Sequence, residues 1–344
     1  MSDAPAIPQI DIGALFGAAG APRDAVDRAI MEASVRYGFM TVTGLPADVK
    51  LDALTLRDLL RVFALPESEQ RKLWRQKFDP RRGNVYRGWF PKQSGTVTCK
   101  EGIDMGPDVA YGAAVVDSAD PLREATPLPS ETVLPGWRAT VGIYYRGMEI
   151  AARALMRSIA RGLGVKETRF DAAFIGGIST LRLLHYPPRT PEELALVADP
   201  ALWTDHAGQK SYVSGRAHVD TGLVTLLAQD GVSGLQARAR DGAWLDVPPR
   251  DGSLAINFGH ILERWSGGRI KATEHRVIGT GAARHSVPFF YEPRVDAEIA
   301  PLALPGIEPF EPFLYGDHLW AAMTRFVEFQ GMEGLRQPRR RAVV

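Results

Sequence analysis

The sequence predicts a mainly β protein with flanking helices, built around a sandwich or jelly roll. Beyond residue 178 the chain holds a series of short apolar segments separated by turn signals such as Asp241-Gly242 and Ser266-Gly267-Gly268. This spacing is typical of sandwiches and jelly rolls rather than of alternating βα sheets. Before the series, residues 137–164 repeat apolar side chains at helical spacing and end at Gly162-Leu163-Gly164, which predicts a long, largely buried helix with a glycine cap.

The N-terminal region is expected to be an α/β extension of this core. Its pattern predicts a strand at 7–12, a helix at 22–37, a strand at 38–44 and a helix at 50–63. Residues 78–112 are rich in Gly, Pro and aromatic side chains and show no sustained period. We interpret them as structured loops, which are often binding surfaces.

The core strands and the C-terminal elements follow in order. Strands are predicted at 179–187, 218–230, 234–240, 242–247, 253–259, 269–279 and 284–293. An amphipathic helix is predicted at 317–329, and the basic tail RQPRRRAVV is expected to be a mobile, solvated end. We therefore divide the chain into an N-terminal region (1–118), a linker with the long supporting helix (119–175), the core (176–295) and a C-terminal helix and tail (296–344), all within one unit.

Composition and charge narrow the classes of function. The 344 residues are 45% apolar and 24% charged, which is ordinary for a globular protein. The 41 Lys plus Arg residues balance 40 Asp plus Glu, so we expect a small-molecule partner and neither nucleic acid nor membrane. The single Cys99 forms no intramolecular disulfide and suits a reducing cytoplasm, and no export signal or long apolar run is present. A monomer and a homodimer are equally compatible.

His218 and Asp220 begin the apolar segment AHVDTGLVTLL. In a strand, side chains two residues apart point to the same face, so an imidazole and a carboxylate are expected side by side. A third ligand is available in His275, within the strand-like segment RIKATEHRVIG. Two His and one carboxylate bound to one face of an octahedral metal leave three positions open, which is the arrangement that non-haem Fe(II) uses to hold an organic co-substrate and dioxygen.

Arg284 and Ser286 form R-x-S at strand spacing, so the guanidinium and the hydroxyl share a face. The fixed fork of Arg matches a carboxylate, and a neighbouring hydroxyl donates one more hydrogen bond to the same group. This pair suits the distal carboxylate of a dicarboxylic acid. If the other end of that acid chelates iron, 2-oxoglutarate has the right groups and length.

Longer segments carry a resemblance to a known family. HVDTGLVTLLAQDGVSGLQ, NFGHILERWSGGRIKATEHRV and RHSVPFFYEP resemble the Fe(II)/2-oxoglutarate-dependent oxygenases of the isopenicillin N synthase-like group. IPQIDI, YGFMTVTG and LPESEQRK resemble the region that precedes the core in that group, so the likeness covers nearly the whole chain. The resemblance implies a double-stranded β-helix core, a jelly roll of the cupin-like kind. It implies iron held by His218, Asp220 and His275, and 2-oxoglutarate held by Arg284 and Ser286.

Tyr186, in RLLHYPP, matches a tyrosine that hydrogen-bonds the co-substrate in this group. Two positions depart from the family pattern: Leu184 stands where an Asn is usual, and His260 stands where an Asp is usual. We interpret His260 as a surface replacement. Cys99 has no His companion in the sequence, so we do not expect a catalytic nucleophile there. Ordinary packing or exposure is expected of His185, His206, His285 and His318.

Arg87, Trp89 and Lys100 lie in the part of the family chain that often borders the substrate pocket. Their charges would suit a polar or carboxylated substrate. An equally good alternative is structural: Lys100 pairs with Glu101, while Trp89 and Phe90 seal the loop. The residues alone do not decide between the two.

The resemblance implies a dioxygenase that oxidises a C–H bond of a small molecule, most often by hydroxylation, and converts 2-oxoglutarate into succinate and carbon dioxide. Fe(II), 2-oxoglutarate and dioxygen are the implied cofactor and co-substrates, with ascorbate as an additive in vitro. One alternative is an isopenicillin N synthase-type oxidase or an ethylene-forming-type enzyme with the same iron site. Another is a non-catalytic jelly roll that binds a small ligand.

Overall fold

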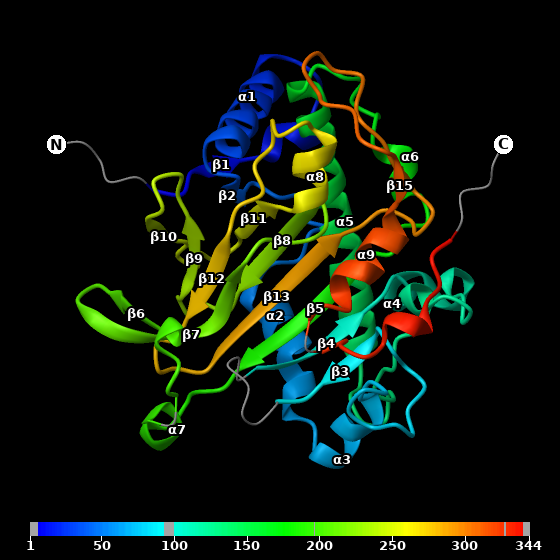
Figure 1. The fold of residues 1–344 in the computed structure, drawn as a ribbon, viewed down its shortest axis with the longest axis vertical. Coiled ribbons are helices and arrows are strands. Elements are labelled where there is room, and N and C mark those ends of the chain that lie inside the picture. The colour runs from blue at the N-terminus through cyan, green and yellow to red at the C-terminus, as the bar shows by residue number, and fades with distance from the viewer. Residues whose placement is uncertain (1–5, 93–99, 196, 327, 340–344) are drawn as a thin grey trace.

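Strands from both halves of the chain build a large sheet that faces a smaller one (Figure 1). The computed structural model describes residues 6–92, 100–195, 197–326 and 328–339. Within these residues the large sheet has eight strands in the order β1-β2-β11-β8-β13-β5-β4-β3, and the small sheet has five in the order β10-β9-β12-β7-β6. Neighbouring strands run antiparallel except for the parallel pair β1 and β2.

The strand bounds are β1 Gln9–Asp11, β2 Phe39–Thr43, β3 Gly88–Phe90, β4 Glu101–Met105, β5 Thr180–Tyr186, β6 Trp203–His206, β7 Gln209–His218, β8 Val224–Gln229, β9 Leu235–Arg238, β10 Trp244–Asp246, β11 Leu254–Phe258, β12 His275–Ile278, β13 Arg284–Tyr291, β14 Glu298–Ile299 and β15 Phe313–Leu314. The α-helices are α1 Ala21–Arg36, α2 Ala53–Leu60, α3 Glu67–Gln70, α4 Asp108–Tyr111, α5 Trp137–Gly162, α6 Asp171–Phe174, α7 Pro191–Ala195, α8 His260–Trp265 and α9 Tyr315–Met323. In the described part of the chain, no helix is long and apolar enough to cross a membrane.

The face of the large sheet that points toward the small sheet is called the inner face below. Because antiparallel partners share a face, the register places alternate residues of β8, β13 and β5 on it. Its members on these strands are Thr225, Leu227 and Gln229; Arg284, Ser286, Pro288 and Phe290; and Thr180, Arg182, Leu184 and Tyr186. Between the sheets, Leu227 packs against the buried cluster Phe39, Leu235, Ala237, Val247, Ala255 and Val277. The jelly-roll core predicted from the sequence is confirmed.

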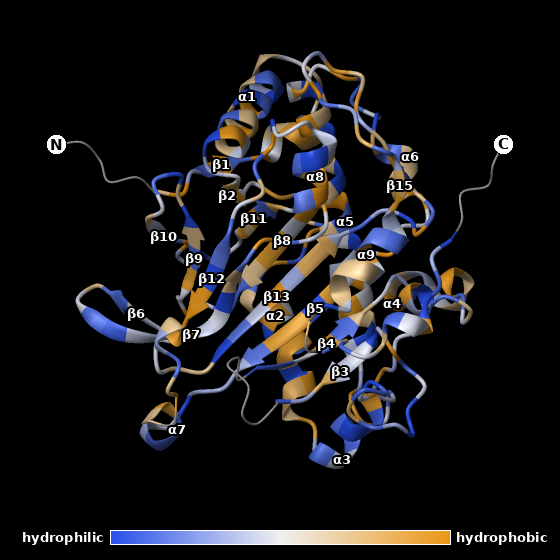
Figure 2. Ribbon diagram, in the orientation of Figure 1, coloured by the Kyte–Doolittle hydropathy of each residue, from blue (hydrophilic) through white to orange (hydrophobic). Residues whose placement is uncertain are grey.

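The opposite face of the large sheet is covered by α5, the long helix that the sequence predicts. Hydrophobic colours dominate the strands in front of it (Figure 2). The Tyr145 ring meets Phe289 of β13 edge-on at 5.0 Å, and its hydroxyl donates to the Ser179 carbonyl at 2.8 Å. Gly162 lets α1 approach, since a Cβ there would lie 2.0 Å from Met31 Cγ. Gly164 then ends the helix with a φ of 76°, as the predicted cap requires.

The strand predicted at 218–230 is two strands in different sheets. His218 is the last residue of β7 in the small sheet, whereas β8 of the large sheet begins only at Val224. Asp220 therefore lies in the connection between the sheets. The expectation that one strand carries His218 and Asp220 side by side was wrong, because the turn after Asp220 is too apolar in sequence to be distinguished from the strand that follows.

Three further pairs of strands were not predicted, among them the short pair β14 and β15. The hairpin of β6 and β7 turns at Ala207 and Gly208, which have φ values of 49° and 77°, as a two-residue hairpin loop requires. Its mostly polar residues show no apolar alternation. Strands β3 and β4 lie within 78–112, where only loops were predicted.

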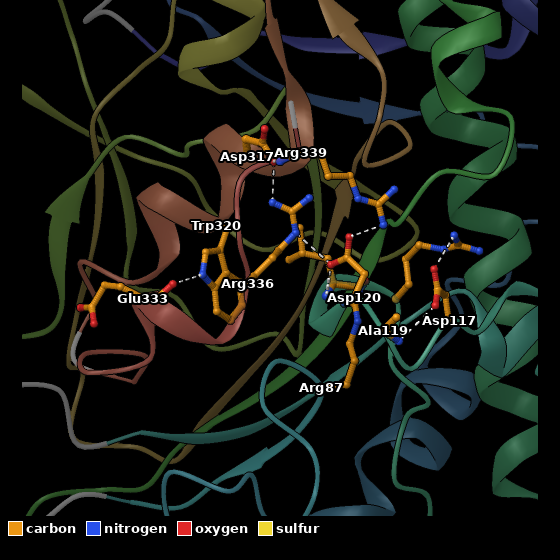
Figure 3. A network of polar contacts seen from close by, with 11 residues as sticks. Arg87, Asp117, Ala119, Asp120, Asp317, Trp320, Glu333, Arg336 and Arg339 are labelled. Atoms are coloured by element: carbon orange, nitrogen blue, oxygen red, sulfur yellow. Dashed lines mark hydrogen bonds and ion pairs between the residues drawn. The ribbon is translucent and has the colours of Figure 1, made fainter. Parts of the chain in front are cut away.

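The C-terminal segment is tied to the rest of the chain by ion pairs, which corrects the expectation of a mobile tail. Arg336 is buried, with its Nε 2.9 Å from Asp120 and its Nη1 2.7 Å from Asp317 (Figure 3). Arg339 binds the other Asp120 oxygen at 2.9 Å. No local pattern indicates these pairs, because the carboxylate partners are distant along the chain. Residues 340–344 of the tail lie outside the described residues.

Candidate metal and co-substrate site

Two histidines at the ends of neighbouring strands of the small sheet come together with one aspartate. His218 ends β7 and His275 begins β12, and the two are direct partners in the antiparallel ladder, with ring centroids 4.4 Å apart. Asp220 Oδ1 lies 3.6 Å from His218 Nε2 and 3.7 Å from His275 Nε2. The three ligand atoms lie within 4.8 Å of one another, so the sequence-predicted triad is assembled.

Hydrogen bonds set the direction of each ligand atom. His218 Nδ1 lies 2.8 Å from the Arg216 carbonyl, and His275 Nδ1 lies 3.1 Å from the Thr273 carbonyl. Because a carbonyl only accepts, both Nδ1 atoms donate, which leaves a lone pair on each Nε2 of the neutral rings.

The aspartate is oriented in the same manner. Asp220 Oδ2 accepts hydrogen bonds from Thr225 Oγ1 at 2.6 Å and from Asn257 Nδ2 at 2.7 Å. Its Oδ1 is the oxygen that faces the histidines. Thr225 and Asn257 were not foreseen in the sequence, although a polar residue inside an apolar strand is the signal that finds them.

The electrostatics favour a bound cation. Burial raises the pKa of Asp220, but the two histidines and the hydrogen bonds outweigh it, so the pKa is lowered and the group is a carboxylate. Desolvation and the neighbouring His275 lower the pKa of His218 against the attraction of Asp220. The His218 side chain is 45% exposed, so water tempers that desolvation. Two neutral imidazoles and one carboxylate are a donor set that fits Fe(II).

The predicted co-substrate residues lie together at the other end of the inner face. Arg284 pairs across the ladder with Tyr186, and Ser286 pairs with Leu184 and with Gln229. Leu184, which replaces the usual Asn, is buried in a cluster with Phe90 and Tyr186. The change from Asn to Leu184 therefore replaces a polar contact with apolar packing.

Arg284 is a buried cation with unused donors. The residue is 4% exposed, and its Nη2 donates a hydrogen bond to Gln229 Oε1 at 3.2 Å. Among the described residues neither Nε nor Nη1 has a partner. A cavity of about 280 Å³ is lined by Arg284, Tyr186 and Tyr212. A buried guanidinium with two free N–H groups at a cavity is suited to a carboxylate.

The metal end and the carboxylate end share the inner face. Thr225 binds Asp220 and Gln229 binds Arg284, and both residues are on β8 with side chains on the same side. Four residues along a strand span about 13 Å. One elongated molecule held at both ends would lie along β8.

The three residues predicted to contact substrate separate into two groups. Lys100 is half-buried, and its charge lowers the pKa of His218 to a smaller extent than burial and His275 do. Arg87 and Trp89 are 0% exposed. They line no space that water can enter, which corrects the expectation that they contact substrate.

The structural alternative for this region holds in part. The Trp89 ring packs against Phe63 at 5.3 Å and seals the loop. Glu101, however, pairs with His185 at 2.8 Å rather than with Lys100. Cys99 lies outside the described residues. His260 is exposed, as a surface replacement should be.

Arg87 has a structural role instead. Its guanidinium donates to Thr180 Oγ1 at 2.6 Å and to the Ile178 carbonyl at 2.8 Å. Thr180 Oγ1 in turn donates to Glu292 Oε2 at 2.8 Å, and the Tyr315 hydroxyl donates to Glu292 Oε1 at 3.0 Å. This network joins the start of β5 to the start of α9.

Glu292 is expected to make folding stability pH-dependent. Burial raises its pKa to about 7, against the opposing effect of Arg87. The folded state then binds more protons than the unfolded chain between the ordinary Glu pKa and 7. The contribution of Glu292 to the free energy of unfolding is complete below the ordinary pKa of a Glu side chain. It is lost as the pH rises through about 7, by up to about 3 kcal/mol.

Glu292→Gln mimics the protonated acid, so its free energy of unfolding should fall less between pH 5 and pH 8 than that of the wild type. Urea denaturation at both pH values measures the difference. Glu308→Gln, at an exposed position, is the control and should retain the wild-type slope. Equal slopes for wild type and Glu292→Gln would show that Glu292 is ionised throughout.

Comparisons with known proteins agree with this geometry. The 2OG-Fe(II) oxygenase superfamily profile matches residues 178–293, and the profile named non-haem dioxygenase in morphine synthesis N-terminal matches residues 7–131. The 2-oxoglutarate-Fe(II) type oxidoreductase hxnY of Emericella nidulans is 30% identical, covering 84% of this chain and 80% of that protein. Isopenicillin N synthase of Streptomyces clavuligerus is 29% identical, covering 94% and 97%.

Solved structures share the fold. A full-length Neurospora crassa protein in complex with alpha-KG superposes with a TM-score of 0.77 at 23% identity, covering 94% of this chain and 98% of that one. The dioxygenase for auxin oxidation of rice superposes with a TM-score of 0.67 at 22% identity, covering 93% and 95%. The chain therefore belongs to the 2OG-Fe(II) oxygenase superfamily, in its isopenicillin N synthase-like group, and is an oxidoreductase.

Proposed function

We propose that this oxygenase hydroxylates a C–H bond of a small organic molecule and turns over 2-oxoglutarate to succinate and carbon dioxide. One observation carries the proposal: two Nε2 lone pairs and Asp220 Oδ1 converge at one end of the inner face, and the free donors of Arg284 lie at the other. An oxidase that uses no 2-oxo acid can keep the same arginine and serine, so consumption of 2-oxoglutarate is the measurement that separates the two reactions.

His218, Asp220 and His275 would hold the metal and leave its remaining positions to ligands from outside the chain. When bound, the ion supplies the activation of dioxygen that is coupled to decarboxylation of the 2-oxo acid. Arg284 and Ser286 would hold the distal carboxylate, and Tyr186 would border it. The chain thus fixes the co-substrate at one end and presents its other end to the metal.

The surroundings of the triad keep its geometry fixed. The Phe39 ring lies edge-on to His275 at 6.2 Å and belongs to the apolar cluster between the sheets. On the other side, Asn257 and Thr225 hold Asp220 from two adjacent strands. Ligands fixed by packing and by hydrogen bonds need little reorganisation when the metal binds.

The test is anaerobic titration with Fe(II), followed by 2-oxoglutarate, with the visible charge-transfer band of the complex as the first readout. Succinate is then counted after oxygen is admitted, with candidate substrates scored for the gain of one oxygen. Appearance of the charge-transfer band, followed by formation of succinate, supports the proposal. Turnover of a substrate without consumption of 2-oxoglutarate would favour the oxidase, and ethylene as the product would favour the ethylene-forming reaction.

We further propose that the enzyme works in the cytoplasm on a diffusible substrate, without nucleic acid, membrane or a hetero-partner. The balanced charge of the chain supports this, because 41 basic and 40 acidic residues give no general attraction to polyanions. Light scattering distinguishes a monomer from a homodimer.

A further inference from the structure

Arg182 is a residue of β5, and its side chain is on the inner face. Along the strand it lies between the first residue of β5 and the co-substrate residues. Its guanidinium lies over the Phe290 ring, 5.4 Å from the centroid. Phe290 is the direct partner of Thr225, and Thr225 binds Asp220. Because β13 alone separates β5 from β8, about 10 Å lies between Arg182 and β8 at the backbone. The side chain is long enough to reach the space beside the triad.

The guanidinium is held in one orientation. Its Nε and Nη2 donate to the two oxygens of Asp104 at 2.5 and 2.8 Å, and Asp104 is its partner across the β4–β5 ladder. Asp104 also accepts from Arg75, whose guanidinium is buried between the rings of Phe90 and Phe329. A bidentate pair on two adjacent strands fixes the direction of Arg182.

Arg182 has donor capacity left on the inner face. Its side chain is 22% exposed, and no residue that the structure describes is hydrogen-bonded to Nη1. Asp104, in contrast, is 1% exposed and shared with Arg75, so one carboxylate serves two cations. Arg182 ties β4 to β5 through Asp104, and Arg75, which lies on neither strand, binds the same carboxylate. The remaining N–H groups of Arg182 are therefore available to a ligand.

The charges nearby define the chemistry of that ligand. Burial lowers the pKa of Arg182, but Asp104 and Glu328 outweigh it, so the group stays a cation. Glu328, on the C-terminal segment, has no ion pair with Arg182 or with any other described residue. The inner face thus has an oriented cation with a free donor.

We propose that the organic substrate carries a carboxylate and that Arg182 binds it beside the metal site. This inference rests on the proposed function and names the substrate class for it. The distal carboxylate of 2-oxoglutarate is already matched by Arg284, and its 2-oxo end by the metal. Arg182 is therefore left for the second reactant.

The first experiment screens matched pairs of small carboxylic acids and their primary amides. The protein loaded with Fe(II) and 2-oxoglutarate is used, and succinate formation above the substrate-free rate is measured. Acids are expected to stimulate turnover and their amides are not. If no acid in the panel stimulates succinate formation in protein that shows the charge-transfer band, or if amides equal acids, the proposal is overturned. Absence of the band itself would instead refute the proposed function.

The second experiment compares Arg182→Gln with Arg157→Gln, using the best acid from the screen. Arg157 makes a similar bidentate pair, with Asp171 on the outer helices, so its variant controls for loss of an ion pair. Loss of one charge-assisted contact should raise the KM for the acid about 10- to 100-fold. Arg182→Lys, which keeps the charge, should recover part of the loss. The concentration of 2-oxoglutarate at half-maximal band intensity should not change.

Two results would contradict this assignment. An unchanged KM for the acid in Arg182→Gln would make Arg182 a structural tie. If half-maximal band intensity requires more 2-oxoglutarate while the KM for the acid is unchanged, Arg182 binds the co-substrate and not the substrate. Since Arg75 still neutralises Asp104, Arg182→Gln is expected to fold, and its circular dichroism spectrum and thermal midpoint confirm this before kinetics.

Discussion

Replacement of His218 by alanine is expected to abolish iron binding and turnover together. The imidazole supplies one of three ligand atoms, and its side chain is 45% exposed, so its removal leaves little cavity in the core. Changes to residues behind the ligands typically cost about 10- to 100-fold in metal affinity or activity, and loss of a ligand should exceed that. Iron content after desalting and succinate formation are the two measurements.

His260→Ala is the matched control for this variant. His260 is exposed at the start of α8, and its backbone N–H, which alanine retains, donates to the Asp220 carbonyl at 2.7 Å. Iron content and turnover should both stay near wild type. Retention of iron and turnover in His218→Ala, with unchanged thermal stability, would exclude His218 as a ligand. A loss in His260→Ala equal to that in His218→Ala would show that the surface interpretation of His260 is wrong.

The triad could be predicted because its residue types are rare in combination, but its construction could not. The sequence suggests that His218 and Asp220 share a strand, whereas the structure brings His218 to His275 through a ladder of the small sheet. Gly259 shows why the turn between the sheets is tight: a Cβ there would lie 2.3 Å from the Gly222 carbonyl oxygen. Such an approach of two backbones depends on contacts distant along the chain, which no local pattern records.

The residues that contact substrate were also difficult to predict from the sequence, because their surroundings depend on contacts distant along the chain. Arg87 was expected at a pocket because this part of the family chain often borders the substrate, yet Thr180 and Ile178, far along the sequence, make a buried site for it. Arg182, which was passed over, has the stronger position. Alternation along RLLHY already places it on the face of Leu184 and Tyr186. The missing information was the register with β4, which supplies Asp104 as its partner.

Arg284→Gln is expected to weaken 2-oxoglutarate binding by about 100-fold, since loss of a buried charge-assisted contact is worth about 3 kcal/mol. Fe(II)-loaded protein is titrated with 2-oxoglutarate, and the charge-transfer band gives the dissociation constant. Arg189→Gln is the matched control, because Arg189 lines the same cavity and its Nη1 binds the Tyr212 hydroxyl at 2.7 Å. That variant should bind 2-oxoglutarate as the wild type does.

The stability of the ligand-free protein separates a binding role from a structural one for Arg284. Burial lowers the pKa of Arg284, and two of its nitrogens have no partner in the described part of the protein, so the cation is poorly compensated without an anion. Removing such a charge should leave the thermal midpoint unchanged or raise it. At a concentration 100 times its dissociation constant, 2-oxoglutarate should stabilise the wild type by about 2.7 kcal/mol and the variant far less. A lower midpoint for the free variant, with an unchanged dissociation constant, would mean that Arg284 holds the strands together rather than the co-substrate.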